Sequence, residues 1–460
     1  MHCLECFMAA EGGELFTPED AENEIDMQKR SAQTLEWKPT SRQSIALTVP
    51  PTVYPPREDT ALLAKRLIQL GAGKGRKFLE IGCGSGALCI LAASLGWDVH
   101  GCDINPFAVA ATRGNLAKNL QSGVIKEGGI GPEEFPFNGK FDLIIWNLPY
   151  IPASEANEVL GPMEEAALID TDEKGLHNRF LSFLAKKDML ASNGKILLLG
   201  RSDSVKATEF FAVREWERLV FDDGESLSIF CLWKPYEYAE KIFLESTGST
   251  NDDLFNKSGV GTHIFTPKQT SGKGRRNRKW ISIDKSYAGS WIVAEDTTIN
   301  PGLLQLAGGL AVINSIDSEG LTLKWPNDIL IGDRKLCGIL VEGKTSQDST
   351  KVVLGIGVNL ETSDKMIDGR EISTLQEIID IDFHHLDRRL NSELASLIEE
   401  RHDLPPVNFE SIRGKILNYM KSLGKPVHSG ITHDNFNLNN RGELVLDGTI
   451  INDGEDIYWI

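Results

Sequence analysis

Two stretches of this sequence combine glycines with polar or charged residues in patterns that suit the binding of a nucleotide. The first, residues 78–86 (Phe-Leu-Glu-Ile-Gly-Cys-Gly-Ser-Gly), reads as an apolar strand that runs into a glycine-rich turn. Glycines are needed where the backbone must approach a ligand without a Cβ in the way. The second, residues 270–280, interleaves glycines with arginines and lysines, and both backbone N–H groups and guanidinium groups bind phosphates. A structural turn and a solvated surface run are the alternatives for the two stretches taken alone.

Polar residues further along the chain extend the first stretch. Asp103 ends the next apolar run, about 20 residues later, where a carboxylate can accept both hydroxyls of a ribose. Asn147-Leu148-Pro149-Tyr150 then follows the apolar run 141–145. The glycines alone would also suit an NAD enzyme, and the run 147–150 alone would suit a turn at the end of a strand. The order of the three features therefore carries the prediction.

These residues resemble the S-adenosylmethionine-dependent methyltransferases that carry an Asn-Pro-Pro-Tyr motif and methylate planar amide or amine nitrogens. With Tyr54-Pro55-Pro56-Arg57-Glu58-Asp59-Thr60 included, the pattern is most similar to the branch that methylates glutamine in translation release factors, and the resemblance covers about residues 42–235. It implies that S-adenosylmethionine is bound by Glu80, Gly82, Gly84, Gly86, Asp103 and Asn147. It also implies that Asn147 is catalytic and that the methyl acceptor is bound by Asn147, Leu148, Pro149 and Tyr150.

The chemical logic of this motif is direct. The asparagine side chain and the next backbone carbonyl bond to the target NH2 group and hold its lone pair toward the methyl group, while the aromatic ring packs on the planar target. Leu148 stands where the family usually has its first proline, so the carbonyl is kept but the fixed φ of proline is lost. A glutamine of a release factor is the first expected acceptor, protein lysine the second and nucleic-acid adenine the third. A module that binds S-adenosylmethionine without catalysis is a further alternative.

Further motifs accompany the basic stretch in a definite order. They are Ser249-Thr250-Asn251, Lys324-Trp325-Pro326-Asn327-Asp328, Arg334–Glu342 and Gly355–Leu360. The ordered set resembles biotin protein ligase from about Phe243 to the C-terminus. The resemblance implies that biotin and ATP are bound by Ser249, Thr250, Asn251, Gln269, Gly272, Lys273, Gly274, Arg275, Trp280, Lys324, Asn327 and Asn359. It makes Lys324, between the biotin carboxylate and the α-phosphate, and Arg275 the catalytic residues, with Mg²⁺ bound together with ATP near Asp328. For Lys335, taken alone, a surface charge is the alternative.

Biotin activation requires such a set. A carboxylate that attacks a phosphate meets charge repulsion, so cations and Mg²⁺ must neutralise it. The biotinyl-5'-AMP anhydride reacts with water, so a closing loop protects it until a lysine of a biotin carboxyl carrier protein or carboxylase domain attacks. The family loop reads Gly-Arg-Gly-Arg-Arg-Gly-Arg; here Lys273 replaces the first arginine and Asn277 the third glycine, where asparagine tolerates a positive φ. Lipoate ligase, which shares the general fold, is the close alternative.

Composition excludes some classes of protein. The chain has 460 residues and a net charge of -18, which repels polyanions and disfavours nucleic-acid binding. Seven scattered cysteines do not resemble a disulfide framework, and the lone pair Cys3 and Cys6 lacks the second pair that a zinc site needs. Neither a secretory signal nor an apolar run of about 18 residues suited to a membrane is visible. A cytoplasmic protein is therefore expected.

The apolar pattern divides the chain into four parts. Residues 1–42, with early acids and few large apolar residues, are predicted to be a disordered acidic tail. Residues 43–235 alternate strand candidates with helix candidates, which predicts a Rossmann-like α/β methyltransferase domain with a mainly parallel sheet and a final hairpin. The main candidates are strands over 77–81, 97–102, 141–146 and 195–199, helices over 87–94 and 106–118, and a hairpin over 218–233.

The remaining chain has a different pattern. Residues 236–415 mix strands and helices around the basic loop, and they are predicted to form the α+β catalytic domain of the ligase. Residues 416–460 are rich in short strands and in Asn, Gly and Asp turns, which predicts a small SH3-like β-barrel cap. No helix-turn-helix pattern precedes Phe243, so a repressor module is not expected.

Overall fold

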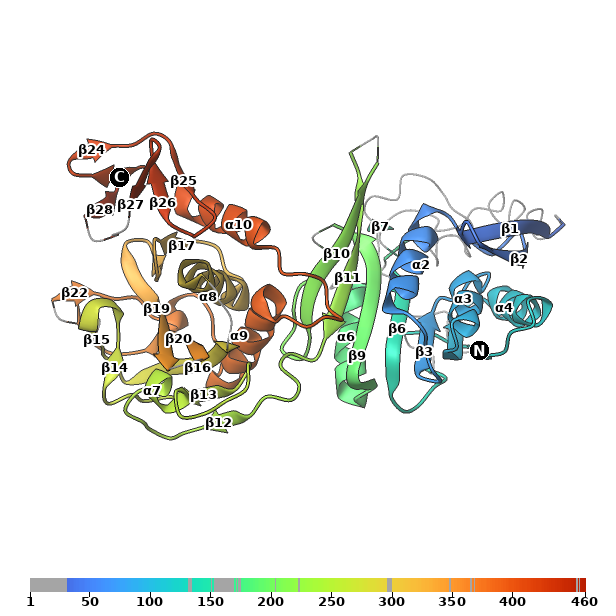
Figure 1. Cartoon of the computed structure of the whole chain (residues 1–460), viewed down its shortest axis with the longest axis horizontal. Helices are drawn as coiled ribbons and strands as arrows, with labels where there is room; N and C mark the ends of the chain where they lie inside the picture. Colours follow the sequence, from blue (N-terminus) through green and yellow to red (C-terminus); the bar gives the residue numbers. More distant parts are fainter. Residues whose placement is uncertain are drawn as a thin grey trace, which may run out of the picture. The chain divides into compact units, whose positions relative to one another are not determined.

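The computed structural model of the chain divides into two compact units (Figure 1). The described residues are 31–130, 135–149, 151–152, 169–170, 172, 175–202, 204–221, 224–295, 300–346, 349–364, 366–367, 369–451, 454 and 456–460. The first unit comprises the chain up to Val205 together with Glu215–Cys231, and the second comprises Lys206–Arg214 together with Leu232–Ile460. The last crossing between the units therefore lies close to the boundary predicted after residue 235. Cys3, Cys6, Tyr150 and the first thirty residues of the predicted tail lie outside the described residues.

A seven-stranded sheet forms the centre of the first unit. Its strands are β3 (Lys77–Ile81), β4 (Asp98–Asp103), β5 (Val124–Glu127), β6 (Phe141–Asn147), β9 (Leu190–Arg201), β10 (Ala212–Val220) and β11 (Ser226–Trp233). Their order in the sheet is β10-β11-β9-β6-β3-β4-β5. β3 pairs in parallel with β4 and β6, and β6 pairs in parallel with β9. The predicted parallel sheet is thus confirmed, and the residues that follow β3, β4 and β6 meet at one edge of it.

Helices follow these strands, as the sequence predicts. They are α2 (Glu58–Leu70), α3 (Ala87–Ser94), α4 (Pro106–Lys118) and α6 (Leu176–Lys187), and a short parallel pair is formed by β7 (Ile151–Pro152) and β8 (Ile169–Asp170). Helices α3 and α4 have the predicted bounds. α3 is apolar on all sides because it packs against α2, α4 and β4. Asn105 caps α4 by accepting the Phe107 N–H, and Pro106 suits the first turn.

The predicted tail is too long. β1 (Gln33–Thr40) and β2 (Gln43–Val49) form an antiparallel pair inside the segment 1–42 and directly after it. Ile45, Leu47 and Val49 are buried at alternate positions, which is the pattern of a half-buried strand. Pairing with β2 then orders β1, whose side chains, apart from Trp37, are mostly exposed and give little signal of their own.

Two asparagines, one in α4 and one at its C-terminal cap, bind the backbone of β2. Asn115 Oδ1 accepts the Thr48 N–H at 2.8 Å, and its Nδ2 donates to Thr48 O and to Ser85 O, both at 2.9 Å. Asn119 makes the same paired contacts with Ala46, at 3.1 and 2.8 Å. These side chains replace a further strand along β2. Because Ser85 lies in the glycine-rich turn, Asn115 also connects the hairpin to that turn.

A second seven-stranded sheet forms the centre of the second unit. Its strands are β12 (Lys241–Phe243), β13 (His263–Thr266), β16 (Lys285–Glu295), β17 (Leu321–Lys324), β18 (Asp328–Ile331), β19 (Arg334–Ser346) and β20 (Ser349–Glu361), in the order β12-β13-β16-β20-β19-β18-β17. Helix α8 (Pro301–Ile316) packs against β18, β19 and β20, and α9 (Phe383–Ile398) packs against α8 and β16 (Figure 1). Twelve of the sixteen residues of α8 are buried, so this helix is the apolar backing of the sheet.

Short elements surround this sheet. They are α7 (Thr250–Leu254), β14 (Gly272–Lys273), β15 (Lys279–Trp280), β21 (Met366–Ile367), β22 (Arg370–Glu371) and two 3-10 turns, η2 (Arg275–Asn277) and η3 (Leu375–Glu377). β14 and β15 pair antiparallel, so the basic stretch is a small hairpin that closes through η2. The sequence predicts this segment only as a loop.

The C-terminal part begins with a helix that the sequence analysis does not predict. α10 (Phe409–Lys421) spans the predicted start of the cap at residue 416, because Ile412, Ile416 and Met420 recur at every fourth position and are buried. The β strands that follow are β23 (Pro426–His428), β24 (Ile431–Thr432), β25 (Phe436–Leu438), β26 (Leu444–Leu446), β27 (Thr449–Ile451) and β28 (Ile457–Trp459). They form two three-stranded sheets. Among the helices of the described residues, none has both the length and the apolarity needed to cross a bilayer.

Asn115→Ala is expected to destabilise the first unit. The change leaves the Thr48 and Ser85 backbone groups without their side-chain partner, and a buried polar group that loses its partner costs about 1–3 kcal/mol. We expect the unfolding free energy of this unit to fall by about 2–4 kcal/mol. Amide hydrogen exchange of β2 and β3 in the full chain measures the change. Lys118→Ala is the matched control, because its exposed contact with Thr48 Oγ1 is worth less than about 1 kcal/mol; equal losses in the two variants would contradict the prediction.

Candidate active sites

A pocket of about 330 Å³ lies in the first unit, at the edge of the sheet where β3, β4 and β6 end. The segment 51–57 and the first residues of α2 complete its wall. The predicted residues that line it are Glu80, Gly82, Gly84, Asp103, Asn147, Leu148 and Pro149. Gly86 is not among the lining residues, and Tyr150 is not described.

Asp103 is fixed against the glycine-rich turn. Its Oδ2 accepts the Gly84 N–H and its Oδ1 accepts the Asn105 N–H, each at 2.9 Å. Burial raises the pKa of Asp103, although both hydrogen bonds oppose the shift. Each carboxylate oxygen keeps a further lone pair, so the pair of oxygens can still accept two hydroxyl groups.

Gly86 has a packing role in the structure. It precedes α3 with a φ of 80°, and a Cβ there would lie 2.8 Å from Thr112 Cγ2. Thr112 Oγ1 in turn donates to Gly84 O at 2.9 Å. The third glycine therefore lets α4 approach the turn, and its role in binding S-adenosylmethionine stays a prediction.

Glu80 is the most strongly perturbed acid of this pocket. Its side chain is buried, and among the described residues its Oε2 has no hydrogen-bond partner. Burial raises the pKa of Glu80 to about 8, although hydrogen bonding with Cys89 lowers it. A carboxyl group with this pKa is mostly protonated at neutral pH, and a neighbouring positive charge would favour its ionised form.

The side-chain amide of Asn147 is oriented by a residue for which the sequence analysis gives no role. Asn147 Nδ2 donates to Asp59 Oδ2 at 2.8 Å, and Asp59 comes from the first turn of α2. Asn147 Oδ1 is buried and has no hydrogen-bond partner among the described residues. An unpaired acceptor therefore belongs to the predicted catalytic side chain.

Leu148 compensates in part for the missing proline. Its N–H, which proline would lack, donates to Leu199 O at 3.0 Å and continues the pairing of β6 with β9 beyond Asn147. The side chain of Leu148 is buried. The backbone is thus held by a ladder hydrogen bond where the family holds it by a fixed φ.

A larger pocket, of about 910 Å³, lies in the second unit. Of the residues predicted to bind biotin and ATP, those that line it are Ser249, Thr250, Asn251, Gln269, Lys273, Gly274, Arg275, Trp280, Lys324, Asn327 and Asn359. Gly272 is the exception. A Cβ at Gly272 would lie 2.7 Å from Trp280 O, so this glycine permits the pairing of β14 with β15.

Neutral polar side chains form one cluster in this pocket. Thr250 Oγ1 contacts Ser290 Oγ at 2.6 Å, and Ser290 Oγ donates to Asn251 Oδ1 at 2.6 Å. Gln269 Oε1 accepts the Thr250 N–H at 2.9 Å, and Asn251 Nδ2 donates to Glu342 Oε2 at 2.7 Å. Ser290 lies on the neighbouring β16, outside the quoted motifs. Glu342 ends the motif Arg334–Glu342, but the sequence analysis gives it no role.

Trp280 lies against a surface made by glycines of the sheet. A Cβ at Gly357 would be 2.6 Å from Trp280 Cε2, and a Cβ at Gly338 would be 3.2 Å from Trp280 Cζ3. These glycines belong to the paired strands β19 and β20, at partner positions. The bare backbone there gives a flat aromatic side chain its place in the pocket.

Lys335, which the sequence suggests is a surface charge, lines the pocket. Its ammonium lies 2.6 Å from Asp328 Oδ1 and 5.9 Å from the centroid of the Trp280 ring. Lys324, the predicted catalytic lysine, lines the same pocket from the end of β17. The alternative of a surface charge thus gives way to a place in the pocket, which both lysines line.

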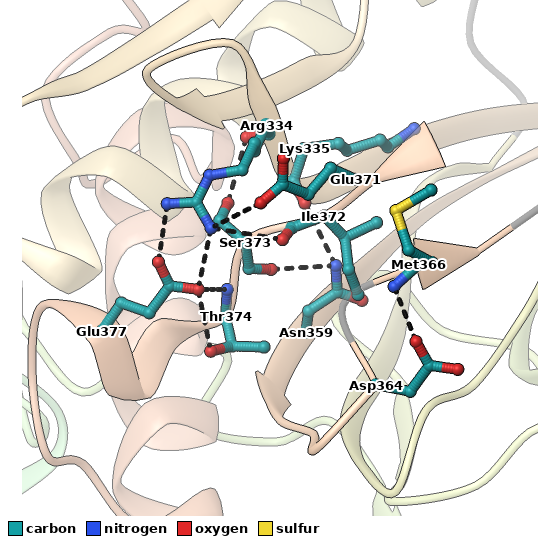
Figure 2. A network of polar contacts seen from close by, with 10 residues as sticks. All are labelled: Arg334, Lys335, Asn359, Asp364, Met366, Glu371, Ile372, Ser373, Thr374 and Glu377. Atoms are coloured by element: carbon teal, nitrogen blue, oxygen red, sulfur yellow. Dashed lines mark hydrogen bonds and ion pairs between the residues drawn. The ribbon is translucent and has the colours of Figure 1, made fainter. Parts of the chain in front are cut away.

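A polar network fixes the backbone of Lys335 (Figure 2). Asn359 Nδ2 donates to Lys335 O and to Ser373 O, both at 3.2 Å, and the Ser373 N–H donates to Lys335 O at 3.0 Å. Arg334 binds Glu377 through both terminal nitrogens, at 2.7 and 3.3 Å, which fastens the segment that carries Ser373. Because its Nδ2 is occupied in this way, Asn359 acts on the site through the position of Lys335.

The basic hairpin departs from the sequence prediction in one detail. The positive φ of its turn is at Arg276, with a φ of 54°, and not at Asn277. Lys273, the residue that replaces the family's arginine, pairs with Asp252 at 2.6 Å. Within the described part of the chain, no group of three or more His, Cys, Asp or Glu residues is placed to hold a metal ion.

Glu80→Gln is expected to stabilise the first unit in a pH-dependent way. The buried carboxyl keeps its proton in the folded state up to about pH 8, whereas the unfolded chain loses it near pH 4.5. Wild-type stability therefore falls as the pH rises between these values, and the neutral glutamine removes this loss. The gain should be small near pH 4.5 and reach a few kcal/mol, on the order of 1.4 per pKa unit, near pH 8. Hydrogen exchange of β3 and β4 at several pH values measures it, with the exposed Glu127→Gln as control; a gain independent of pH would argue against the burial of a protonated Glu80.

Comparisons with known proteins separate the two halves. The Biotin/lipoate A/B protein ligase family model matches residues 242–359, and the Ribosomal protein L11 methyltransferase (PrmA) model matches residues 59–151. The biotin--[acetyl-CoA-carboxylase] ligase of Mycobacterium tuberculosis is 34% identical over 224 residues, which are 44% of this chain and 80% of that protein. A "Putative protein N5-glutamine methyltransferase" of Methanocaldococcus jannaschii is 34% identical over 140 residues, which are 30% of this chain and 68% of that protein.

Other similarities are more partial. A biotin protein ligase of Aquifex aeolicus, solved in complex with biotin and ATP, is 26% identical; the match covers 48% of this chain and 98% of that chain, with a TM-score of 0.38. The chain spans about half or less of the length of the bifunctional ligase/repressors BirA of Escherichia coli and Bacillus subtilis, which it also matches. The ligase of Mycobacterium tuberculosis and the methyltransferase relative of Methanocaldococcus jannaschii show that the chain is a fusion, which belongs through its C-terminal half to the biotin protein ligase family and through its N-terminal half to the methyltransferase family of that relative.

Proposed function

We propose that the second unit activates biotin with ATP as biotinyl-5'-AMP and passes biotin to a lysine of a biotin carboxyl carrier protein or carboxylase domain. One observation carries this proposal: a single pocket of about 910 Å³ is lined both by a neutral polar cluster and by many basic side chains. This volume is near the upper limit of the roughly 300–1,000 Å³ that ligand pockets occupy. The pocket therefore has room for two ligands that must react with each other.

The basic residues suit the first step. The biotin carboxylate attacks the α-phosphate and pyrophosphate leaves, so negative charge must be neutralised along the path of attack. Lys335 and Lys324 both line the pocket, and the ion pair with Asp328 and the ring of Trp280 hold the Lys335 ammonium inside it. We assign the charge-neutralising role to both lysines together with Arg275. Trp280 is then placed to offer its ring to the adenine.

The neutral polar cluster favours biotin over lipoate. Thr250, Asn251 and Gln269, with Ser290 behind them, offer hydroxyl and amide groups, and the ureido ring of biotin carries both donors and an acceptor. The dithiolane ring of lipoate carries none, so these groups would lose their water without gaining a partner. This argument separates the two substrates that the family name includes.

Magnesium fits this site only through ATP. Asp328 is a single carboxylate, and Mg²⁺ commonly binds one or two carboxylates together with substrate phosphates. The ammonium of Lys335 lies beside this carboxylate. We therefore place the magnesium that accompanies ATP near Asp328, where it would neutralise phosphate charge.

Lys335→Ala and Lys324→Ala are each expected to slow the release of pyrophosphate from biotin and MgATP, by about 10²-fold or more, because each removes a charge that stabilises the transition state. The assay follows pyrophosphate release, and mass spectrometry follows biotin on a carrier domain. Lys285→Ala is the control, since this lysine pairs with Glu361 on the surface and does not line the pocket. Full activity of either pocket variant removes that lysine from the proposed mechanism. If the wild-type protein modifies the carrier with lipoate and not with biotin, the choice of substrate is wrong.

We propose further that the first unit transfers a methyl group from S-adenosylmethionine to a nitrogen, with a glutamine of a peptide chain release factor as the first candidate. Support comes from the convergence of Gly82, Gly84 and Asp103 with Asn147 in one pocket, and from the unpaired Oδ1 of Asn147. An acceptor oxygen suits a target that donates an N–H. Protein lysine and nucleic-acid adenine stay as alternatives, and the net charge of -18 weighs against adenine in a polyanion.

The finer features of the fold belong to the same proposal. The parallel order β6-β3-β4, with a glycine-rich turn after β3, supports a Rossmann-like domain. The two three-stranded sheets after α10 support an SH3-like cap on the ligase.

Radiolabelled S-adenosylmethionine tests the first unit. The full chain is expected to label a glutamine-containing release factor, and Asn147→Ala is expected to lower the rate by about 10²-fold while S-adenosylmethionine still binds. Mass spectrometry locates the methyl group. Labelling of DNA or of lysine alone would reject the release-factor glutamine, and binding of S-adenosylmethionine without any transfer would favour a non-catalytic module.

A further inference from the structure

We propose that Asp59 is a positioning residue that fixes the orientation of the Asn147 amide and so restricts methyl acceptors to groups that donate an N–H. The inference rests on the proposed methyl transfer and adds a determinant of acceptor specificity to it. It concerns the two ends of one side-chain amide, which have the same shape and opposite hydrogen-bonding character.

The contact between the two side chains decides which end faces the acceptor. Asn147 Nδ2 donates to Asp59 Oδ2 at 2.8 Å. A carboxylate oxygen can only accept, so the amide nitrogen and not the amide oxygen must face Asp59. Without this partner, the two orientations of the amide would differ little in energy.

Asp59 is itself held in place. It is 6% exposed, and its Oδ1 accepts hydrogen bonds from the Thr60 N–H at 2.5 Å and from Thr60 Oγ1 at 3.1 Å. Asp59 lies in the first turn of α2, where the helix dipole favours a negative charge. The Asp59 carboxylate therefore has a fixed position, from which it orients the side chain of Asn147, 88 residues further along the chain.

The other end of the amide is left for the ligand. Asn147 Oδ1 is buried without a hydrogen-bond partner among the described residues, and Asn147 lines the pocket together with Asp59 and Leu148. A buried acceptor without a partner costs about 1–3 kcal/mol. A methyl-accepting group that donates an N–H to Asn147 Oδ1 removes this cost. A carboxylate or ester oxygen in the same place would instead bring one lone pair against another.

The same contact strengthens the oxygen as an acceptor. Donation from Nδ2 to a carboxylate polarises the amide and places more negative charge on Oδ1. Positive charge grows on the attacking nitrogen as the methyl group moves from the sulfonium, so Oδ1 binds the N–H more strongly in the transition state than before it. Asp59 therefore acts on the reaction through Asn147.

A reciprocal exchange of the two residues tests this assignment. Asp59→Asn introduces a second amide, which can donate its nitrogen to Asn147. The Asn147 amide can then turn around, so that its nitrogen and not its oxygen faces the methyl acceptor. In the double variant Asp59→Asn/Asn147→Asp, the amide introduced at position 59 keeps its oxygen toward Thr60 and donates its nitrogen to the carboxylate introduced at position 147. The hydrogen bond is then restored with its direction reversed, and an oxygen again faces the acceptor.

The expected results differ between the variants of the full chain. Asp59→Asn and Asn147→Asp should each lower kcat by about 10²-fold, while the Kd for S-adenosylmethionine from calorimetry changes by less than about threefold. The double variant should recover at least about tenfold over either single variant, because the two effects are coupled. Glu58→Gln, next to Asp59 and exposed, is the matched control and should keep the wild-type kcat. A wild-type kcat in Asp59→Asn, or a double variant no faster than the single ones, would overturn the assignment.

A measurement on the unaltered protein covers the case in which a variant does not fold. With S-adenosylhomocysteine bound, a peptide that carries glutamine should bind at least about tenfold more tightly than the same peptide with glutamate, because only the amide can donate to Oδ1. Equal affinities would overturn the orientation of Asn147. If the wild-type protein transfers no methyl group to any acceptor, methyl transfer itself fails, and this comparison of peptides still decides the orientation of the amide.

Discussion

Both pockets depend on one constraint, namely that a buried polar group needs a hydrogen-bond partner. In the first unit, Asp103 accepts hydrogen bonds from the backbone N–H groups of Gly84 and Asn105, and Asp59 accepts one from the side-chain nitrogen of Asn147. These internal hydrogen bonds occupy some of the buried donors and acceptors. Other polar atoms, such as Asn147 Oδ1, have no partner among the described residues. The protein thus determines which complementary groups a ligand must bring. Specificity follows from the contacts behind the pocket as much as from the residues that face it.

The second unit uses the same principle on a paired sheet. Backbone without side chains at Gly338 and Gly357 lets Trp280 lie close to β19 and β20, and Gly355 makes room for Asn251 in the same way. The polar network of Asn359, Ser373 and Glu377 then fixes the backbone from which Lys335 extends (Figure 2). The sheet thus carries two of the basic groups to which we assign charge neutralisation in the proposed reaction, while the more exposed residues lie on the short hairpin β14–β15. Preorganised charge of this kind acts without reorganisation at the moment of reaction.

Local sequence patterns predict much of this architecture. The bounds of β3, α3 and α4 and the parallel sheet follow from apolar periodicity, whereas most predicted residues of the two pockets come from the resemblance of the ordered motifs to known families. Sequence reasoning failed where a residue's role depends on a distant partner. Asp59 orients a side chain 88 residues away. The ammonium of Lys335 is positioned by its contacts with Asp328 and the Trp280 ring. Pairing with β2 orders β1. Gly86 and Gly272 fit their motifs as ligand contacts, and the positions of Thr112 and Trp280 give each of them a packing role that the motifs do not reveal.

The fusion of the two activities has a simple physical reading. The residues that line the smaller pocket all come from the first unit, and those that line the larger pocket all come from the second. Among the described residues, each proposed reaction can therefore be written with the side chains of a single unit. The effect of the fusion is then on the amounts of the two sites, because one polypeptide carries both in a one-to-one ratio. Coupling between them would require a free-energy difference that one ligand creates at the other site, and nothing in the composition of either pocket demands one.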